Sequence, residues 1–111
     1  MTYDEDVANL IRELMADEQG VTEKKMFGGL AFLIGGNMSV AASGQGGLLV
    51  RVDPAQTEAL LEEPHAAPFE MRGRAMDGWL RVDPEGARTA SDVGPWVQRG
   101  VAYARSLPPK G

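Results

Sequence analysis

The clearest pattern in the chain is a period of two between residues 29 and 52. Positions of one parity are apolar in three successive segments, namely Leu30, Phe32 and Ile34, then Met38, Val40 and Ala42, then Leu48, Val50 and Val52. This alternation is typical of strands, and the intervening GGN and SGQGG segments are typical of tight turns. The pattern therefore predicts strands at 29–34, 37–42 and 47–52 that form an antiparallel meander.

The opposite parity of the same three segments is also poor in charge. It carries Ala31, Leu33, Ser39, Ala41, Leu49 and Arg51. A sheet face of this kind has to be covered by the chain's own helices, by a partner protein or by a second copy. We therefore expect a protein partner, and self-association into a homodimer is one form of this prediction.

Residues 26–50 contain no charged side chain, which raises two other interpretations of this stretch. A membrane helix is excluded because seven glycines and several polar residues interrupt it. A phosphate-binding loop is excluded because neither G-x-G-x-x-G nor G-x-x-x-x-G-K-[ST] occurs in the chain. The meander is the interpretation that remains, and we expect no association with a membrane.

The rest of the chain predicts a helix at each end and a short one in the middle. The first covers 3–18 and stops near Gly20, with a buried stripe of Val7, Leu10, Ile11, Leu14 and Met15. The other expected elements are a helix from Pro54 capped by Asp53 and Gln56, a loop at 63–69, a short strand near 69–72, a strand at 77–82, a turn at 83–86 and a helix from Asp92 or Gly94 to Ser106.

These elements predict an α+β fold, because the strands occur in a block that helices flank. We expect an antiparallel sheet, made of the three-strand meander and one or two further strands, with N-terminal, middle and C-terminal helices packed on it. The chain should form one domain over 1–111, with a flexible tail from residue 107. The predicted core contains Leu10, Leu14, Phe32, Met38, Val40, Val50 and Trp96.

The charge of the chain limits the classes of partner that we expect it to bind. It has 16 Asp and Glu residues against 11 Lys and Arg residues, which gives a net charge of −5. Because nucleic-acid affinity comes mainly from cations that neutralise phosphates, we expect no specific duplex DNA binding by this chain alone. The chain has no cysteine, which excludes disulfides and thiol catalysis and is consistent with a cytoplasmic location.

No group of residues has the spacing of a catalytic or metal site. His65, the single histidine, has no adjacent catalytic partner and stands in a proline-flanked segment, so we interpret it as a surface residue. Lys24 and Lys25 could meet an acidic or phosphate-bearing partner, although they also suit the edge of a sheet that must stay soluble. The sequence therefore predicts no enzyme.

The segment MRGRAMDGW places two cations, Arg72 and Arg74, near two methionines and Trp79. Arginine, methionine and tryptophan are enriched at protein interfaces. The same residue types can close the open side of a small sheet, so both interpretations of this segment stay open.

Four segments in order give the chain a resemblance to the TfoX N-terminal domain family, namely KKMFGGLAFLIGGNMSV, LLVRVD, MRGRAMDGWLRV and PWVQRGVAYARSLP. The most specific piece is the start of the first, formed by Lys24, Lys25, Met26, Phe27, Gly28 and Gly29. The resemblance implies a curved antiparallel sheet with helices packed against it, in a stand-alone member of a family named after regulators of natural competence. It implies no catalytic residues.

Two functional hypotheses follow. In the first, the chain is a non-enzymatic interaction or regulatory module that binds a protein partner through its sheet. In the second, it binds a small ligand or nucleic acid through Lys24, Lys25, Arg72 and Arg74. A continuous apolar patch would favour the first and a cationic patch the second, and neither requires a metal or a cofactor.

Overall fold

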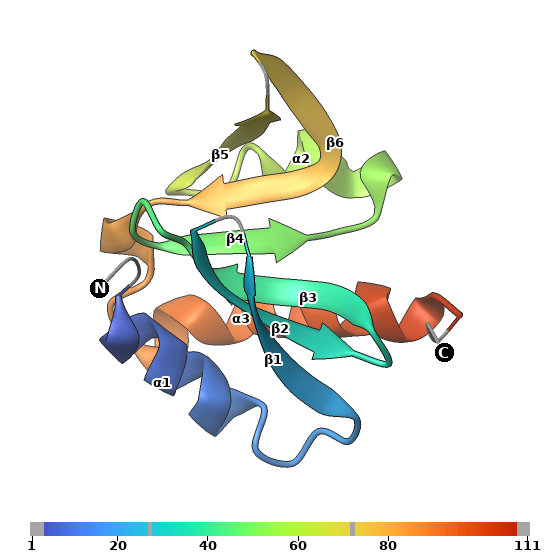
Figure 1. Ribbon diagram of the computed structural model, residues 1–111. Coiled ribbons are helices and arrows are strands. Elements are labelled where there is room, and N and C mark those ends of the chain that lie inside the picture. The colour runs from blue at the N-terminus through green and yellow to red at the C-terminus, as the bar shows by residue number, and fades with distance from the viewer. Residues whose placement is uncertain (1–3, 27, 72, 109–111) are drawn as a thin grey trace.

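The structure is a computed structural model that describes residues 4–26, 28–71 and 73–108 of the 111-residue chain. Its elements follow the order α1 (Glu5–Leu14), β1 (Val21–Met26), β2 (Gly29–Ile34), β3 (Asn37–Ala42), β4 (Leu48–Arg51), η1 (Pro54–Gln56), α2 (Thr57–Leu60), β5 (Ala66–Met71), β6 (Arg74–Val82), η2 (Pro84–Gly86) and α3 (Ala90–Ser106), where η1 and η2 are short 3-10 helices (Figure 1).

The six strands form one antiparallel sheet in the order β1-β2-β3-β4-β6-β5. The predicted meander is confirmed, because β2, β3 and β4 are adjacent and begin and end within one residue of the expected positions. Helix α3 lies behind the strands in the view of Figure 1, and α1 packs beside it. The predicted α+β class is therefore confirmed.

Helix α1 begins after Asp4, whose carboxylate accepts hydrogen bonds from the backbone N–H groups of Asp6 and Val7. Such a cap satisfies amide groups that have no partner within the helix. Val7, Ile11 and Met15 are buried, so the predicted stripe does face the core at these positions.

One core prediction on this helix was wrong. Leu14 is 37% exposed, whereas Leu10 is partly buried and packs against the core. Leu14 lies at the margin of the stripe, and its side chain lies at the mouth of the groove between α1 and α3. The prediction that the helix stops near Gly20 was also wrong, because it ends at Leu14, and Gly20 adopts a φ of 75° just before β1.

Strand β1 was not predicted. Most of its side chains are exposed, and its Thr-Glu-Lys-Lys segment shows no alternation of apolar residues. It pairs only with β2, so it forms one edge of the sheet, where charged side chains discourage pairing with another chain. This position agrees with the interpretation of Lys24 and Lys25 as edge residues.

The loop predicted at 63–69 is wrong over its second half. Strand β5 begins at Ala66 and contains Pro68, and β6 begins at Arg74 rather than at residue 77. Proline lacks an N–H group and is tolerated on an edge strand, and β5 is the other edge of the sheet. Proline therefore marked an edge strand here and not a loop.

The middle and last helices differ from prediction in their caps. Asp53 accepts a hydrogen bond from the Ala55 N–H, as expected of a cap, whereas Gln56 makes no capping hydrogen bond. Helix α3 begins at Ala90, earlier than predicted, because Thr89 and Asp92 form a reciprocal capping box. The turn predicted at 83–86 corresponds to η2.

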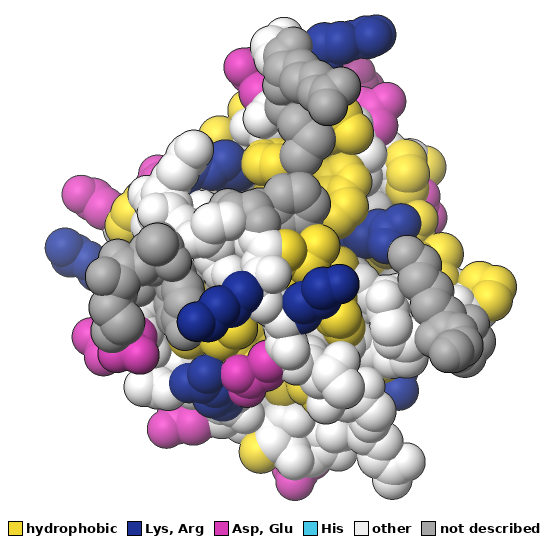
Figure 2. Space-filling model, in the orientation of Figure 1, with side chains coloured by type: hydrophobic (Ala, Val, Ile, Leu, Met, Phe, Trp, Pro, Cys, Tyr) yellow, Lys and Arg dark blue, Asp and Glu magenta, His cyan; other side chains and the backbone are white. Residues whose placement is uncertain are grey.

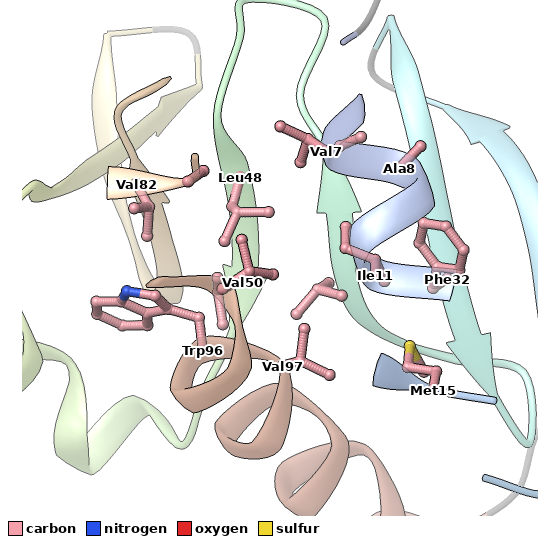
Figure 3. Close-up of a cluster of buried hydrophobic side chains, with 14 of the residues drawn as sticks. Val7, Ala8, Ile11, Met15, Phe32, Leu48, Val50, Val82, Trp96 and Val97 are labelled. Carbon is pink, nitrogen blue, oxygen red and sulfur yellow. The ribbon is translucent and has the colours of Figure 1, made fainter. Parts of the chain in front are cut away.

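The core lies between one face of the sheet and the two long helices. Figure 3 shows Val7, Ala8 and Ile11 of α1 and Trp96 and Val97 of α3 directed toward the side chains of the strands. Phe32, Val40, Val50 and Trp96 are buried, as predicted.

A β-bulge at Ser39 changes which face Met38 occupies. Phe32 pairs with Val40 but Leu33 pairs with Met38, so Ser39 is the extra residue of β3. Its hydroxyl donates a 2.8 Å hydrogen bond to the Phe32 carbonyl oxygen. Met38 is buried as predicted, but on the side of the sheet opposite to the helix-packed core, which corrects the predicted parity.

The bulge also lies under α3. A Cβ atom at Gly100 would overlap the Ser39 carbonyl oxygen and approach the Val40 side chain at 2.8 Å. We therefore expect Gly100→Ala to lower the free energy of unfolding by about 1–3 kcal/mol, although alanine favours helices, because the backbone of β3 must move. Urea unfolding measures this.

Gly94→Ala is the matched control in the same helix. Its Cβ atom would make only an ordinary contact with Leu14, at 3.9 Å, and Pro95 offsets part of the helix-propensity gain. We expect a change within about 1 kcal/mol. Equal effects at the two glycines would contradict the close approach of α3 to β3.

An ion pair joins α1 to the edge strand β1. Arg12 Nε and Nη2 donate to the two carboxylate oxygens of Glu23, each at 2.9 Å. This hydrogen bond lowers the pKa of Glu23 below its usual value, against a smaller opposing effect of burial. Because the folded pKa is lowered, the pair stabilises the fold above the pKa of the unfolded chain and the stabilisation is lost as the pH falls through the folded pKa.

Glu23→Gln should therefore destabilise the protein near neutral pH by less than about 1 kcal/mol, since both side chains are partly exposed. The difference from wild type should disappear in acid. Urea unfolding at both pH values measures it, with Glu13→Gln on α1 as the control. A difference that persists in acid would show that the carboxylate charge is not what joins the two elements.

Candidate functional site

The face of the sheet opposite the helices carries a second apolar cluster. Its floor consists of four buried side chains, namely Ala31, Met38, Ala41 and Leu49. Its rim consists of four partly buried ones, namely Met26, Leu33, Phe69 and Trp79. We call this floor and rim the second face. No helix of the described residues contributes to the cluster.

Small floor residues allow the rim to close over the sheet. Ala31 lies opposite Ala41, and Ala41 lies opposite Leu49, so the centre of the floor is low. Phe69 and Trp79 lie to one side with ring centroids 6.1 Å apart. The sequence prediction that this face needs a cover is met in part by the sheet's own large side chains.

The sheet is curved enough to bring its two edge strands to one hollow. Met26 of β1 and Phe69 of β5 line the same space of about 40 Å³, together with Ala41, Leu49 and Arg81. On the face seen in Figure 2, hydrophobic side chains gather over β4 and β6, with Lys and Arg side chains beside them. We call this space, which is also lined by Gly29, Ala42, Ser43 and Gln45, the Arg81 hollow.

The glycine pair after β1 sets the close approach of the strands. Gly28 adopts a φ of 73°, in the left-handed region that favours glycine. A Cβ atom at Gly29 would overlap the Ala42 carbonyl oxygen of β3. These two residues thus have structural roles near the hollow that need no ligand.

The second face is positive around its floor, although the chain as a whole carries a net charge of −5. In β1 to β4, and from Trp79 to Arg81 in β6, the charged residues at register positions of this face are Lys24, Arg51 and Arg81. Asp77 follows the same alternation two residues before Trp79, outside these positions. This part of the face therefore combines an apolar floor with positive charge.

Arg51 is engaged by aromatic rings. Its guanidinium carbon lies 5.4 Å from the ring centroid of Trp79 and 5.5 Å from that of Tyr103 on α3. These are cation–π distances. Arg51 thus holds Trp79 at the rim and links the second face to the last helix.

Arg81 has a different environment. Its Nε atom is buried and has no hydrogen-bond partner, and the described residues form no ion pair with its guanidinium. Sequence reasoning missed Arg81, although its position two residues after Trp79 on a strand was a usable signal.

The predicted site residues do not form one group. Lys24 and Lys25 are consecutive on β1 and therefore point to opposite faces, with Lys24 on the side of the second face. Arg74 is exposed at the start of β6. Met26 and Trp79 are on the rim. Phe27 and Arg72 lie outside the described residues.

His65 forms a separate polar contact. Its Nδ1 atom lies 3.0 Å from an Asp83 carboxylate oxygen, and its φ of 68° is unusual for a residue other than glycine. In the described part of the chain, no group of three or more His, Cys, Asp or Glu side chains is arranged to hold a metal ion. His65 therefore stays interpreted as a surface residue.

Comparison with known proteins gives one finding. The model of the TfoX N-terminal domain matches residues 13–104, which cover all six strands and most of α3. No curated protein matches the chain. None of the helices in the described ranges has the length and apolar character needed to span a bilayer.

Proposed function

The chain belongs to the TfoX N-terminal domain family, and from this premise we propose that it is a non-enzymatic interaction module whose second face binds an extended segment of a partner protein. The observation that carries the proposal is the apolar floor of this face, which a rim of partly buried large side chains surrounds and no helix of the described residues covers. Its regulatory role would then be exerted through the bound partner.

The residue types of the face support a protein partner. Two methionines, a tryptophan, a phenylalanine and two arginines meet there, and these types are enriched at protein interfaces. The cation–π contact with Arg51 restrains the Trp79 side chain, so that less conformational entropy is lost on binding. A partly pre-ordered aromatic rim is the kind of feature that anchors a ligand.

The curvature favours a segment over a second copy. In a two-fold dimer the same patch faces itself, so each surface has to fit its own copy. Here the hollow lies between the two edge strands and is concave, and two hollows that face one another leave a void. A narrow segment that enters the hollow avoids this void, so we place homodimerisation second.

The positive charge of the face favours an acidic or otherwise anionic partner. It also keeps the second hypothesis, an anionic small ligand or nucleic acid, as the alternative function. Its cations are Lys24, Arg51 and Arg81 rather than a cluster of Lys24, Lys25, Arg72 and Arg74. The net charge of −5 opposes a nucleic-acid role, because long-range repulsion acts on every phosphate.

Leu33→Asp tests the proposal. Peptide-display selection on the wild type should recover peptides that bind it, and Leu33→Asp should weaken their binding by about tenfold or more, because a charge is then desolvated on the rim. Leu14→Asp is the matched control, since Leu14 is an exposed leucine on the helix side of the molecule. Thermal unfolding checks that both variants fold.

Equal losses in the two variants, or peptides whose binding neither variant affects, would contradict the proposal. Sedimentation tests the second copy as occupant: a monomer at about 100 μM excludes it, since weak interfaces have micromolar affinities. If the wild type is a dimer and Leu33→Asp dissociates it, the occupant of the second face is a second copy of this chain and not a partner segment.

A further inference from the structure

The Arg81 hollow is lined by a residue whose hydrogen bonding is incomplete. The Nε atom of Arg81 is buried and has no hydrogen-bond partner among the described residues. A buried donor without a partner is costly, and more so when it belongs to a charged group. Such an atom in a folded protein calls for a water molecule, an ion or a ligand.

The walls of the hollow leave this donor unbonded. The lining is apolar around Met26, Leu49 and Phe69, and it also includes two polar side chains, Ser43 and Gln45. Each of these two carries an oxygen that can accept a hydrogen bond, but neither bonds the Arg81 Nε. The Arg81 Nε therefore has no hydrogen bond to the described residues of the lining.

Other arginines of the chain differ from Arg81 in their contacts. Arg51 lies against two aromatic rings, and Arg12 and Arg105 are paired with glutamates. Arg81 has neither kind of contact with the described residues, although it is the arginine of this group with a buried Nε. No acidic residue pairs with Arg81 in the sheet, since its cross-strand partners are Leu49 and Ala67.

The hollow is large enough for a small polar group of a ligand. Its space of about 40 Å³ exceeds the 10–15 Å³ that one water molecule requires, so it has room for a carboxylate-sized group. A guanidinium presents planar pairs of N–H donors, and such a pair matches the two oxygens of a carboxylate. An apolar wall beside the charge strengthens such a contact by excluding water.

We propose that the Arg81 hollow is an acidic-group subsite, in which Arg81 binds a carboxylate of the partner segment while an adjacent apolar side chain of that segment packs on Met26 and Phe69. This inference rests on the proposed function for the identity of the ligand. The anion site itself is defined by the chain alone, so it can be tested without a partner.

The first test follows the Arg81 Nε–Hε resonance by NMR while sodium acetate is added to the whole chain. A saturable shift is expected below about 100 mM, because a single charge-assisted contact has millimolar affinity at best. Sodium chloride at matched ionic strength controls for screening. The Nε–Hε resonances of Arg88, which is exposed, and Arg12, which Glu23 already holds, should show no saturable shift.

Sodium phosphate forms the second arm of the titration. A saturable Arg81 shift with acetate that exceeds the shift with phosphate supports the carboxylate. A stronger response to phosphate would overturn the carboxylate assignment in favour of a phosphate-bearing ligand. If neither salt gives a saturable shift, or if chloride gives the same shift, water alone satisfies the hydrogen bonding of Arg81. Either result would overturn the proposed subsite.

Variants at Arg81 separate the subsite from a structural role. Arg81→Gln should reduce binding of acidic display-selected peptides by about tenfold or more, and Arg81→Lys should restore part of it. Both should keep the thermal midpoint of the wild type or raise it, since the arginine has no partner to lose. Arg88→Gln is the matched control. A lowered midpoint with unchanged peptide binding would assign Arg81 a structural role and overturn the proposal.

The two proposals can fail separately. If acetate saturates Arg81 but no peptide binds at the second face, the partner segment is wrong and the anion subsite stands. If peptides bind and Leu33→Asp weakens their binding while Arg81→Gln does not change it, the proposed subsite is wrong and the proposed interaction module stands.

Discussion

The contact between Gly100 of α3 and the bulged backbone at Ser39 is the constraint on which the rest of the structure depends. Because glycine has no side chain, α3 can approach the β3 backbone closely at Ser39. Ser39 is the extra residue of the bulge, so the side chains of β3 before it point to the opposite face from the one that regular alternation predicts. Met38 thereby moves to the floor of the second face. Asn37 is buried and donates a 2.9 Å hydrogen bond to the Pro108 carbonyl oxygen just beyond α3. One close approach thus fixes the last helix and shapes the candidate site.

The sequence could predict the meander because burial and strand period coincide there. Every residue of β3 is buried, so parity alone could not reveal that Ser39 is a bulge and that Met38 faces away from the helices. Strand β1 had no such signal, because exposed edge strands do not alternate. Leu14 was misassigned since a helical stripe gives the direction of burial but not its margins.

The candidate site was only partly accessible to sequence reasoning. The low polarity of Ala31, Leu33, Ala41 and Leu49 already indicated a second apolar face. The involvement of Phe69 and Arg81 depends on the curvature that brings β5 and β1 to one hollow, and curvature is a property of long-range pairing. Of the cations chosen from the sequence, Lys24 and Lys25 are consecutive on β1 and therefore point to opposite faces of the sheet.

The two faces of the sheet have different environments. One face is covered by α1 and α3 and supplies the main hydrophobic core. The other carries partly buried aromatic and methionine side chains and an arginine whose Nε has no hydrogen-bond partner among the described residues. The methionine methyl groups report on both faces, since Met15 lies in the helix-packed core and Met26 and Met38 lie in the second face. Methyl NMR of the whole chain with a bound acidic peptide is therefore the most direct test of the account. We expect the Met26 and Met38 signals to shift and the Met15 signal to stay unchanged, whereas a shift of Met15 without the other two would place the ligand on the helix side and contradict it.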